Sequence, residues 1–181
     1  TYVTFLLDET GSMATIKDDT IGGFNSFIDG LKKSPDEIAF TLIKFDSNHT
    51  TKVHVGEPMA LVLPLTSKTY VPGASTPLID ACFKAIKATE EKVASLAEKS
   101  NVMVVIQTDG QENASTEHTK DELNLLIKEK TSAGWVFNFI GAGIDAFAVA
   151  GAMGISASNT MTYDRNNSAA AFGANATRVT A

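Results

Sequence analysis

The chain has 181 residues, 44% of them hydrophobic, and its 15 Lys and Arg against 21 Asp and Glu give a formal net charge of −6. A domain of this length buries roughly 70% of the surface of its unfolded chain, so we expect one domain over 1–181 that needs no disulfide or metal to fold. The excess of acidic residues argues against a nucleic-acid binder. No apolar run approaches the ~20 residues of a membrane span. We therefore expect a soluble protein that binds neither nucleic acid nor a membrane.

The first half of the chain alternates strand and helix patterns. Apolar β-formers over 3–7 predict a strand that ends at Asp8, and a 3.6-residue apolar period over 16–31 predicts a helix after it. A serine–proline step closes this helix, and 38–45 is predicted to be a second strand. Residues 53–55 suggest a short strand, followed by an irregular, proline-punctuated connection.

The second half continues the alternation. Pro77 suits the first turn of a helix whose apolar stripe extends over 78–96, and this helix carries Cys82, the only cysteine. A lone cysteine excludes an intrachain disulfide, so the default expectation is a reducing, cytoplasmic compartment. The sequence begins without methionine, so a targeting segment upstream of it is not excluded. The remaining predicted elements are a buried strand at 102–106, a helix around 123–127, a strand at 135–140, a short helix at 144–152, a strand at 160–163 and a closing helix at 168–179.

Strands that alternate with helices predict a doubly wound, Rossmann-like α/β fold. We expect a mostly parallel central sheet with helices on both faces and one antiparallel edge strand. Ligands of such sheets bind beyond the carboxyl ends of the strands. The search for a functional site therefore starts at the loops that follow the strands.

Three of these loops carry hard oxygen ligands. They are 8–12 after the first strand, 73–78 before a helix, and 108–110 after the central buried strand. Together they offer two carboxylates and three hydroxyls, the groups that magnesium, calcium and manganese prefer. The sequence predicts one divalent-metal site here, with a coordination position left open.

The same loops resemble a known family. Residues 5–13, Phe-Leu-Leu-Asp-Glu-Thr-Gly-Ser-Met, resemble the Asp-x-Ser-x-Ser signature of the metal-ion-dependent adhesion site in von Willebrand factor A domains, with Thr10 in place of the first serine. The loop 73–78 resembles that family's threonine loop, which gives the role to Thr76, and 108–110 resembles its strand-end aspartate. The three motifs occur in the family's order, and the resemblance covers nearly the whole chain.

The resemblance implies a non-enzymatic adhesion or assembly domain. Its metal ligands would be Asp8, Thr10, Ser12, Thr76 and Asp109, several of them through water. The preferred ion is Mg²⁺, and Mn²⁺ or Ca²⁺ also suits these oxygens. An Asp or Glu of a protein partner would complete the metal's shell, because water-mediated carboxylates leave its charge under-neutralised. Two departures, Glu9 in a variable position and Ser75 where many relatives carry glycine, can alter the hydroxyl geometry or the ion's electrophilicity.

Two other functions stay open. A haloacid dehalogenase-like phosphatase also begins with an aspartate at a strand end, with Asp109 and Glu112 as its metal motif, but it usually places a second aspartate where this chain has Thr10. A metal-free structural domain is the third reading, since Asp, Thr and Ser are also ordinary turn and helix-cap residues.

The remaining polar motifs have simpler interpretations. His49, His54 and His118 lack ligand spacing and are expected on the surface or an edge strand. Residues 141–146 match Gly-x-Gly-x-x-Ala, with Asp164 as a ribose-binding candidate, but they follow a late strand, so we attribute the glycines to a turn. Glu112 and Asn113 are expected on the rim of the site as solvated loop residues, outside the metal shell.

Overall fold

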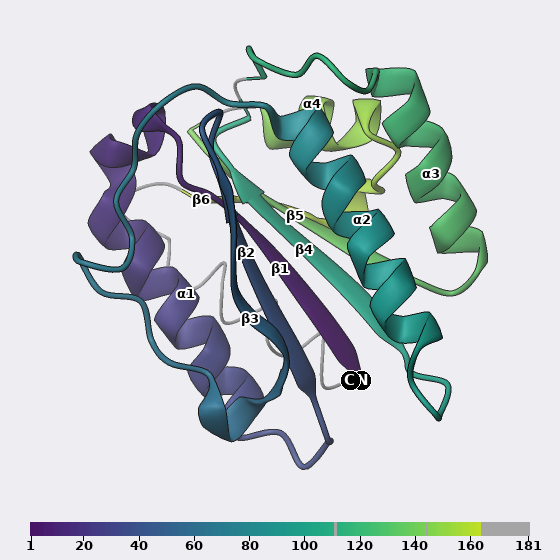
Figure 1. Ribbon diagram of the computed structural model, residues 1–181. Coiled ribbons are helices and arrows are strands. Elements are labelled where there is room, and N and C mark those ends of the chain that lie inside the picture. Colours follow the sequence, from purple (N-terminus) through teal and green to yellow (C-terminus); the bar gives the residue numbers. More distant parts are fainter. Residues whose placement is uncertain (111, 144, 164–181) are drawn as a thin grey trace.

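The computed structural model describes residues 1–110, 112–143 and 145–163, and all its strands belong to one six-stranded sheet (Figure 1). The strand order is β3-β2-β1-β4-β5-β6, and only the β2/β3 pair is antiparallel. The strands are β1 Tyr2–Asp8, β2 Ala39–Phe45, β3 Thr50–Pro58, β4 Val102–Thr108, β5 Val136–Ala142 and β6 Thr160–Tyr163. The predicted doubly wound, mostly parallel sheet with one antiparallel edge strand is confirmed.

Four α-helices and three short 3₁₀ turns connect the described strands. They are η1 Gly11–Ile16, α1 Lys17–Lys32, η2 Met59–Leu61, α2 Leu78–Ala94, α3 Lys120–Ser132, α4 Ala146–Ala152 and η3 Ala157–Asn159. Pro77 precedes α2 as its N-cap residue instead of lying in its first turn. The expected helix at 168–179, Asp164 and Ile144 lie outside the described residues.

The helices cover both faces of the sheet (Figure 1). Successive residues of a strand point to opposite faces, so Phe5 packs on one side and Leu6 on the other. On the α1 face, the Phe5 ring meets the rings of Phe24 and Phe27 edge-on, both at a centroid distance of 5.2 Å. On the opposite face, Leu6 belongs to an apolar cluster with residues of α2, α3 and α4, including the buried Cys82. Two cores therefore hold the sheet rigid between the helices.

The register brings the strand ends together. Asp8 pairs with Phe45 of β2, Leu7 pairs with Gln107 of β4, and Thr108 pairs with Gly141 of β5. Because these strands are parallel, the loops that follow them emerge at the same edge. None of the helices in the described part of the chain is both long and apolar enough to cross a membrane.

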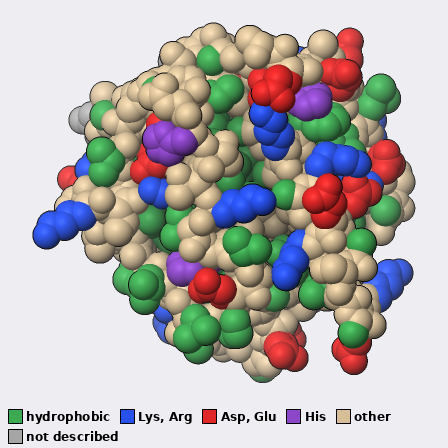
Figure 2. All heavy atoms as spheres, viewed as in Figure 1, with side chains coloured by type: hydrophobic (Ala, Val, Ile, Leu, Met, Phe, Trp, Pro, Cys, Tyr) green, Lys and Arg blue, Asp and Glu red, His purple; other side chains and the backbone are tan. Residues whose placement is uncertain are grey.

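The outer surface agrees with the charge balance. On the face shown in Figure 2, the Lys side chains of the described residues are interspersed with acidic ones and form no continuous stripe. A phosphate backbone needs such a stripe for sequence-independent binding. That this chain binds no nucleic acid stays a prediction.

Candidate metal centre

Backbone hydrogen bonds join two of the three predicted loops. Gly11 donates its N–H to the carbonyl of Ala74 at 3.0 Å, and Gly73 donates to the carbonyl of Glu9 at 2.9 Å. A Cβ on Gly11 would come within 3.3 Å of the Ala74 oxygen, which explains the value of glycine there. Ala74 itself has φ of 62°, a left-handed conformation that a Cβ disfavours. The sequence therefore accepts local strain to hold these loops side by side.

Asp8 lies at the centre of this edge and is completely buried. Its Oδ1 accepts the backbone N–H of Thr10 at 2.8 Å, and its Oδ2 accepts the hydroxyl of Thr108 at 2.6 Å. The hydroxyl of Tyr70 donates to the Asp8 carbonyl at 2.6 Å. The carboxylate is thus held by the loop after β1 and by the end of β4, while the connection between β3 and α2 holds the main-chain carbonyl of Asp8.

Two buried threonine hydroxyls adjoin this carboxylate. Thr76 donates its hydroxyl to that of Thr10 at 3.0 Å, and the Thr10 side chain also hydrogen-bonds to Asp8. Thr10 and Thr76 are 0% and 2% exposed. The structure therefore brings Asp8, Thr10 and Thr76, three residues expected to form one site, into a single hydrogen-bonded group.

The other two expected ligands lie at the margin of this group. Asp109 directly follows Thr108, is 7% exposed, and its charge acts on Asp8. Ser12 lies in the first turn of η1 and is exposed to solvent. Among the described residues, no hydrogen bond links the Ser12 hydroxyl to the buried group. Its approach to a shared ion stays a prediction.

The electrostatics of Asp8 suit a cation. Burial raises the pKa of Asp8 to about 6, hydrogen bonds from Thr10 and Thr108 oppose the rise, and the charge of Asp109 adds to it. In the described part of the chain, no lysine, arginine or histidine forms an ion pair with Asp8. A buried carboxylate without a positive partner is unfavourable. A divalent cation held by these oxygens would offset both the burial and the repulsion, so the donor set fits the predicted metal.

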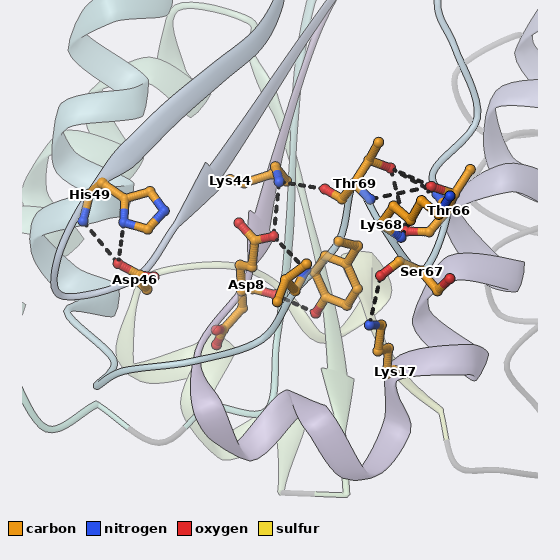
Figure 3. A network of polar contacts seen from close by, with 12 residues as sticks. Asp8, Lys17, Lys44, Asp46, His49, Thr66, Ser67, Lys68 and Thr69 are labelled. Atoms are coloured by element: carbon orange, nitrogen blue, oxygen red, sulfur yellow. Dashed lines mark hydrogen bonds and ion pairs between the residues drawn. The ribbon is translucent and has the colours of Figure 1, made fainter.

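Glu9 forms a separate contact next to this group. Its Oε1 accepts the ammonium of Lys44 at 2.8 Å and the backbone N–H of Val71 at 2.8 Å. Lys44 also donates to the carbonyl of Thr69 at 2.6 Å (Figure 3). Glu9 therefore joins β1 to the end of β2 and to the connection that precedes the Thr76 loop.

Sequence reasoning missed two residues that position the centre. Thr108 fixes Asp8 and also accepts the N–H of Gly110 at 2.8 Å; its place at the end of the strand beside β1 was the available signal. Asn113 accepts the N–H of Thr76 at 2.8 Å, while its own N–H donates to the Thr76 carbonyl at 3.0 Å. No spacing rule in the sequence pairs Asn113 with Thr76.

Glu112 differs from its expected role as a solvated loop residue. Its Oε2 accepts the N–H of Ile79 in the first turn of α2 at 2.8 Å, and its Oε1 accepts the N–H groups of Ala114 and Ser115. Burial alone would raise the pKa of Glu112, but these hydrogen bonds outweigh it and lower the pKa. The side chain is a structural cap of the helix that follows Thr76.

The weaker motifs remain outside the centre. His54 lies on edge strand β3 and bonds to Glu57 through Nδ1 at 2.7 Å, while His49 is exposed beside Asp46 (Figure 3). Of the two glycines attributed to a turn, Gly143 follows β5 with φ of 61°, whereas Gly141 lies within β5. Asp145 then caps the short helix α4 by accepting the N–H of Ala148 at 3.0 Å. No group of three or more His, Cys, Asp or Glu suited to a metal occurs within the described ranges. The predicted centre, with two carboxylates and three hydroxyls, is of a different kind.

Two recesses adjoin the N-terminal part of α2. One, of about 260 Å³, is lined by polar groups that include Asp46, Asp80 and Glu117, and Ser47 in its wall accepts the N–H of Ser75 at 3.1 Å. The other, of about 280 Å³, is mostly apolar and lies between α2 and α4 beside Gly110 and Glu112. Both recesses adjoin the first turns of α2, and neither is lined by a candidate ligand.

Comparisons with known proteins identify the fold. No protein-family model matches the sequence, and no curated protein matches it. Among solved structures, the von Willebrand factor domain of the type V pili tip protein Mfa5 from Porphyromonas gingivalis is similar over 98% of this chain and 94% of its own, with 13% identity and a TM-score of 0.74. The manganese-loaded TRAP protein of Plasmodium vivax matches over 93% of this chain and 70% of its own, with 20% identity and a TM-score of 0.61.

A third similar structure contains a metal in the corresponding motif. Proximal thread matrix protein 1 from the mussel byssus, with a zinc-occupied metal-ion-dependent adhesion site, matches over 97% of this chain at 15% identity and a TM-score of 0.61. This chain spans 45% of that protein's length. At such identities the likeness establishes the fold, and this chain has the von Willebrand factor A-like fold that its sequence motifs predicted.

Proposed function

We propose that this domain binds one divalent metal ion at the carboxyl edge of its sheet and uses it to hold an acidic residue of a protein partner. The observation that carries the proposal is the convergence of Asp8, Thr10 and Thr76 from two distant loops into one buried, hydrogen-bonded group that lacks a described positive partner. A manganese-loaded protein and one with a zinc-occupied metal-ion-dependent adhesion site, both of similar fold, support it.

Each proposed ligand has a distinct role. Thr10, Ser12 and Thr76 give hydroxyl oxygens to the ion, while Asp8 and Asp109 supply negative charge, directly or through water. Bound there, the ion supplies a Lewis-acidic position for an incoming carboxylate. Carboxylates that reach the ion through water neutralise its charge incompletely, so the ion favours a direct bond to an anionic ligand. Mg²⁺ is the expected ion, and Mn²⁺ fits the same oxygens.

Metal titration followed by thermal melting tests the first half of the proposal. A ligand that binds only the folded state raises its stability by about 2.7 kcal/mol at a concentration one hundred times the dissociation constant. We expect Mg²⁺ and Mn²⁺ to raise the midpoint, EDTA to reverse the rise, and Asp8→Ala to abolish it. Asp46→Ala is the matched control, since Asp46 is a buried carboxylate after β2 that bonds to Asn48 and His49. A thermal-unfolding midpoint that does not change with metal would favour the metal-free structural domain.

Partner binding tests the second half. Capture of an acidic peptide array, with and without EDTA, is expected to give metal-dependent spots that contain Asp or Glu. Amide substitution of that acid should remove them. A phosphate-ester assay runs alongside: activity that disappears in Asp8→Ala would favour the phosphatase, whose second carboxylate this chain replaces with the Thr10 hydroxyl.

The compartment is a separate expectation. Cys82 is 1% exposed, and burial raises the pKa of its thiol. A thiol so protected survives in a reducing or an oxidising compartment. Cytoplasmic localisation therefore stays a prediction, which fractionation of cells that express the full protein would test.

A further inference from the structure

An ion pair lies directly behind the candidate metal loop. Glu9, between Asp8 and Thr10 in the chain, has a side chain that is 6% exposed, and the Lys44 side chain 2.8 Å away is 13% exposed. The Lys44 ammonium donates to this carboxylate and also to the Thr69 carbonyl, and Figure 3 shows its contact with Thr69. Both charges are therefore largely withdrawn from solvent within one residue of the proposed ligands.

The charge of Glu9 matters to any cation held by its neighbours. The proposed shell contains two carboxylates, Asp8 and Asp109, and an uncompensated Glu9 would add a third negative charge close by. Such a charge would bind the cation more firmly and reduce its attraction for an incoming carboxylate. In the structure that charge is paired, because Lys44 contacts Oε1 directly.

We propose that Lys44 is the residue that sets the selectivity of this centre: its ammonium cancels the Glu9 charge, so that a bound divalent cation stays short of negative charge and keeps its affinity for a partner's carboxylate. This inference rests on the proposed function above. It makes Lys44 a positioning and charge-setting residue that touches neither metal nor partner. It also explains why a glutamate is compatible with this position of the loop.

The rival explanation is purely mechanical. Lys44 and Glu9 also hold the connection through Thr69 and Val71, so in this explanation loss of the pair only loosens the loops. The two explanations predict opposite signs. Loosened loops weaken metal binding and carboxylate binding together. An uncovered Glu9 charge strengthens metal binding and weakens carboxylate binding.

The experiment measures both affinities in four variants of the full chain. Mn²⁺ is titrated calorimetrically, and acetate is then titrated into the Mn²⁺-saturated protein and followed by water-proton relaxation. For Lys44→Met we expect Mn²⁺ to bind severalfold more tightly, because the uncovered Glu9 charge attracts the divalent ion. Acetate should bind more weakly by a comparable factor. Lys44→Arg keeps the charge and should behave as the wild type.

Glu9→Gln and the double variant complete the cycle. Glu9→Gln leaves an unmatched ammonium, so Mn²⁺ should bind more weakly and acetate more tightly, the reverse of Lys44→Met. The double variant Glu9→Gln/Lys44→Met removes both charges and should return both affinities toward the wild type. Glu9→Gln keeps the size and shape of the side chain, so it remains informative if Lys44→Met folds poorly.

The results separate this inference from the function on which it rests. A wild type that binds no Mn²⁺ refutes the proposed metal site itself. A wild type that binds Mn²⁺, with both affinities weakened or both unchanged in Lys44→Met and Glu9→Gln, refutes the charge-setting role and leaves the metal site standing. Opposite shifts in the two single variants, cancelled in the double, support it.

Discussion

Replacing Asp8 with asparagine should stabilise the protein without metal and abolish its response to metal. In the folded state burial raises the pKa of Asp8 from an ordinary 3.8 to about 6, so the folded chain holds its proton more tightly than the unfolded chain does. At 1.36 kcal/mol per pKa unit, ionised Asp8 at neutral pH destabilises the metal-free fold by about 3 kcal/mol. Asparagine has the same shape and no charge to desolvate.

The sign of the pH dependence follows from the same shift. Between 3.8 and about 6 the folded state binds more protons than the unfolded state, so stability without metal falls as pH rises through this window. Below the lower value both states are protonated and the penalty vanishes. Asp8→Asn should lack this slope, and saturating Mg²⁺ should reduce it, because the ion compensates the ionised carboxylate.

The assay is urea denaturation in EDTA and in Mg²⁺, across this pH range. At pH 7 in EDTA we expect Asp8→Asn to raise the free energy of unfolding by up to about 3 kcal/mol. In a thermal melt the same gain corresponds to a rise of about 6 to 12 °C in the midpoint for a domain of this size. In Mg²⁺ the wild type should recover most of the difference and the variant should not respond.

Asp80→Asn is the control of opposite sign. Burial favours a higher pKa for Asp80, but N–H groups of Thr116, Glu117 and His118 outweigh it and lower the pKa, so the substitution should destabilise the fold and leave the metal response intact. If Asp8→Asn instead destabilises the EDTA-treated protein, or still responds to Mg²⁺, the reasoning about an uncompensated buried carboxylate is wrong.

Three further substitutions test the loops around the centre. Asn113→Ala removes the acceptor for the Thr76 N–H and should lower stability by about 1 kcal/mol and weaken Mn²⁺ binding severalfold, as read by calorimetry. Ala74→Gly should stabilise the fold by up to about 1 kcal/mol in urea denaturation, because φ of 62° suits glycine. Glu112→Gln weakens the cap on Ile79. Because the pKa of Glu112 is lowered in the folded state, its carboxylate stabilises the fold above the ordinary 4.5, and this stabilisation is lost as pH falls. The free energy of unfolding of the variant should therefore fall less steeply than that of the wild type as pH is lowered.

The fold was predictable because its signals are local and repeated. Period-2 and 3.6-residue apolar patterns, with a continuous apolar run in 102–106, identified every described strand and the helices between them. Boundaries were less certain, since the turn from Gly11 is 3₁₀ before it becomes α1, and Pro77 precedes α2. Both differences concern helix ends, where capping geometry and tertiary contacts decide the last residues.

The candidate site was only partly predictable. Its proposed ligands follow strands or precede a helix, so the parallel topology alone places their loops at one edge. Residues that position them depend on pairings between distant loops: Asn113 with Thr76, and Lys44 with Glu9. Such pairings depend on the three-dimensional path of the loops, which no period in a single sequence encodes.

The buried arrangement around Asp8 suggests why this edge suits a cation and not merely a turn. A structural turn could satisfy its orphan amides with a solvent-exposed serine or aspartate and incur no desolvation. Here a fully buried aspartate receives hydrogen bonds from Thr10 and Thr108, yet its pKa stays raised to about 6 because burial outweighs them. Hydrogen bonds alone leave the charge destabilising, and a nearby Asp109 adds to the penalty. The desolvated charge of Asp8, next in the chain to a Glu9 charge that Lys44 covers, is therefore the charge that the proposed cation would compensate.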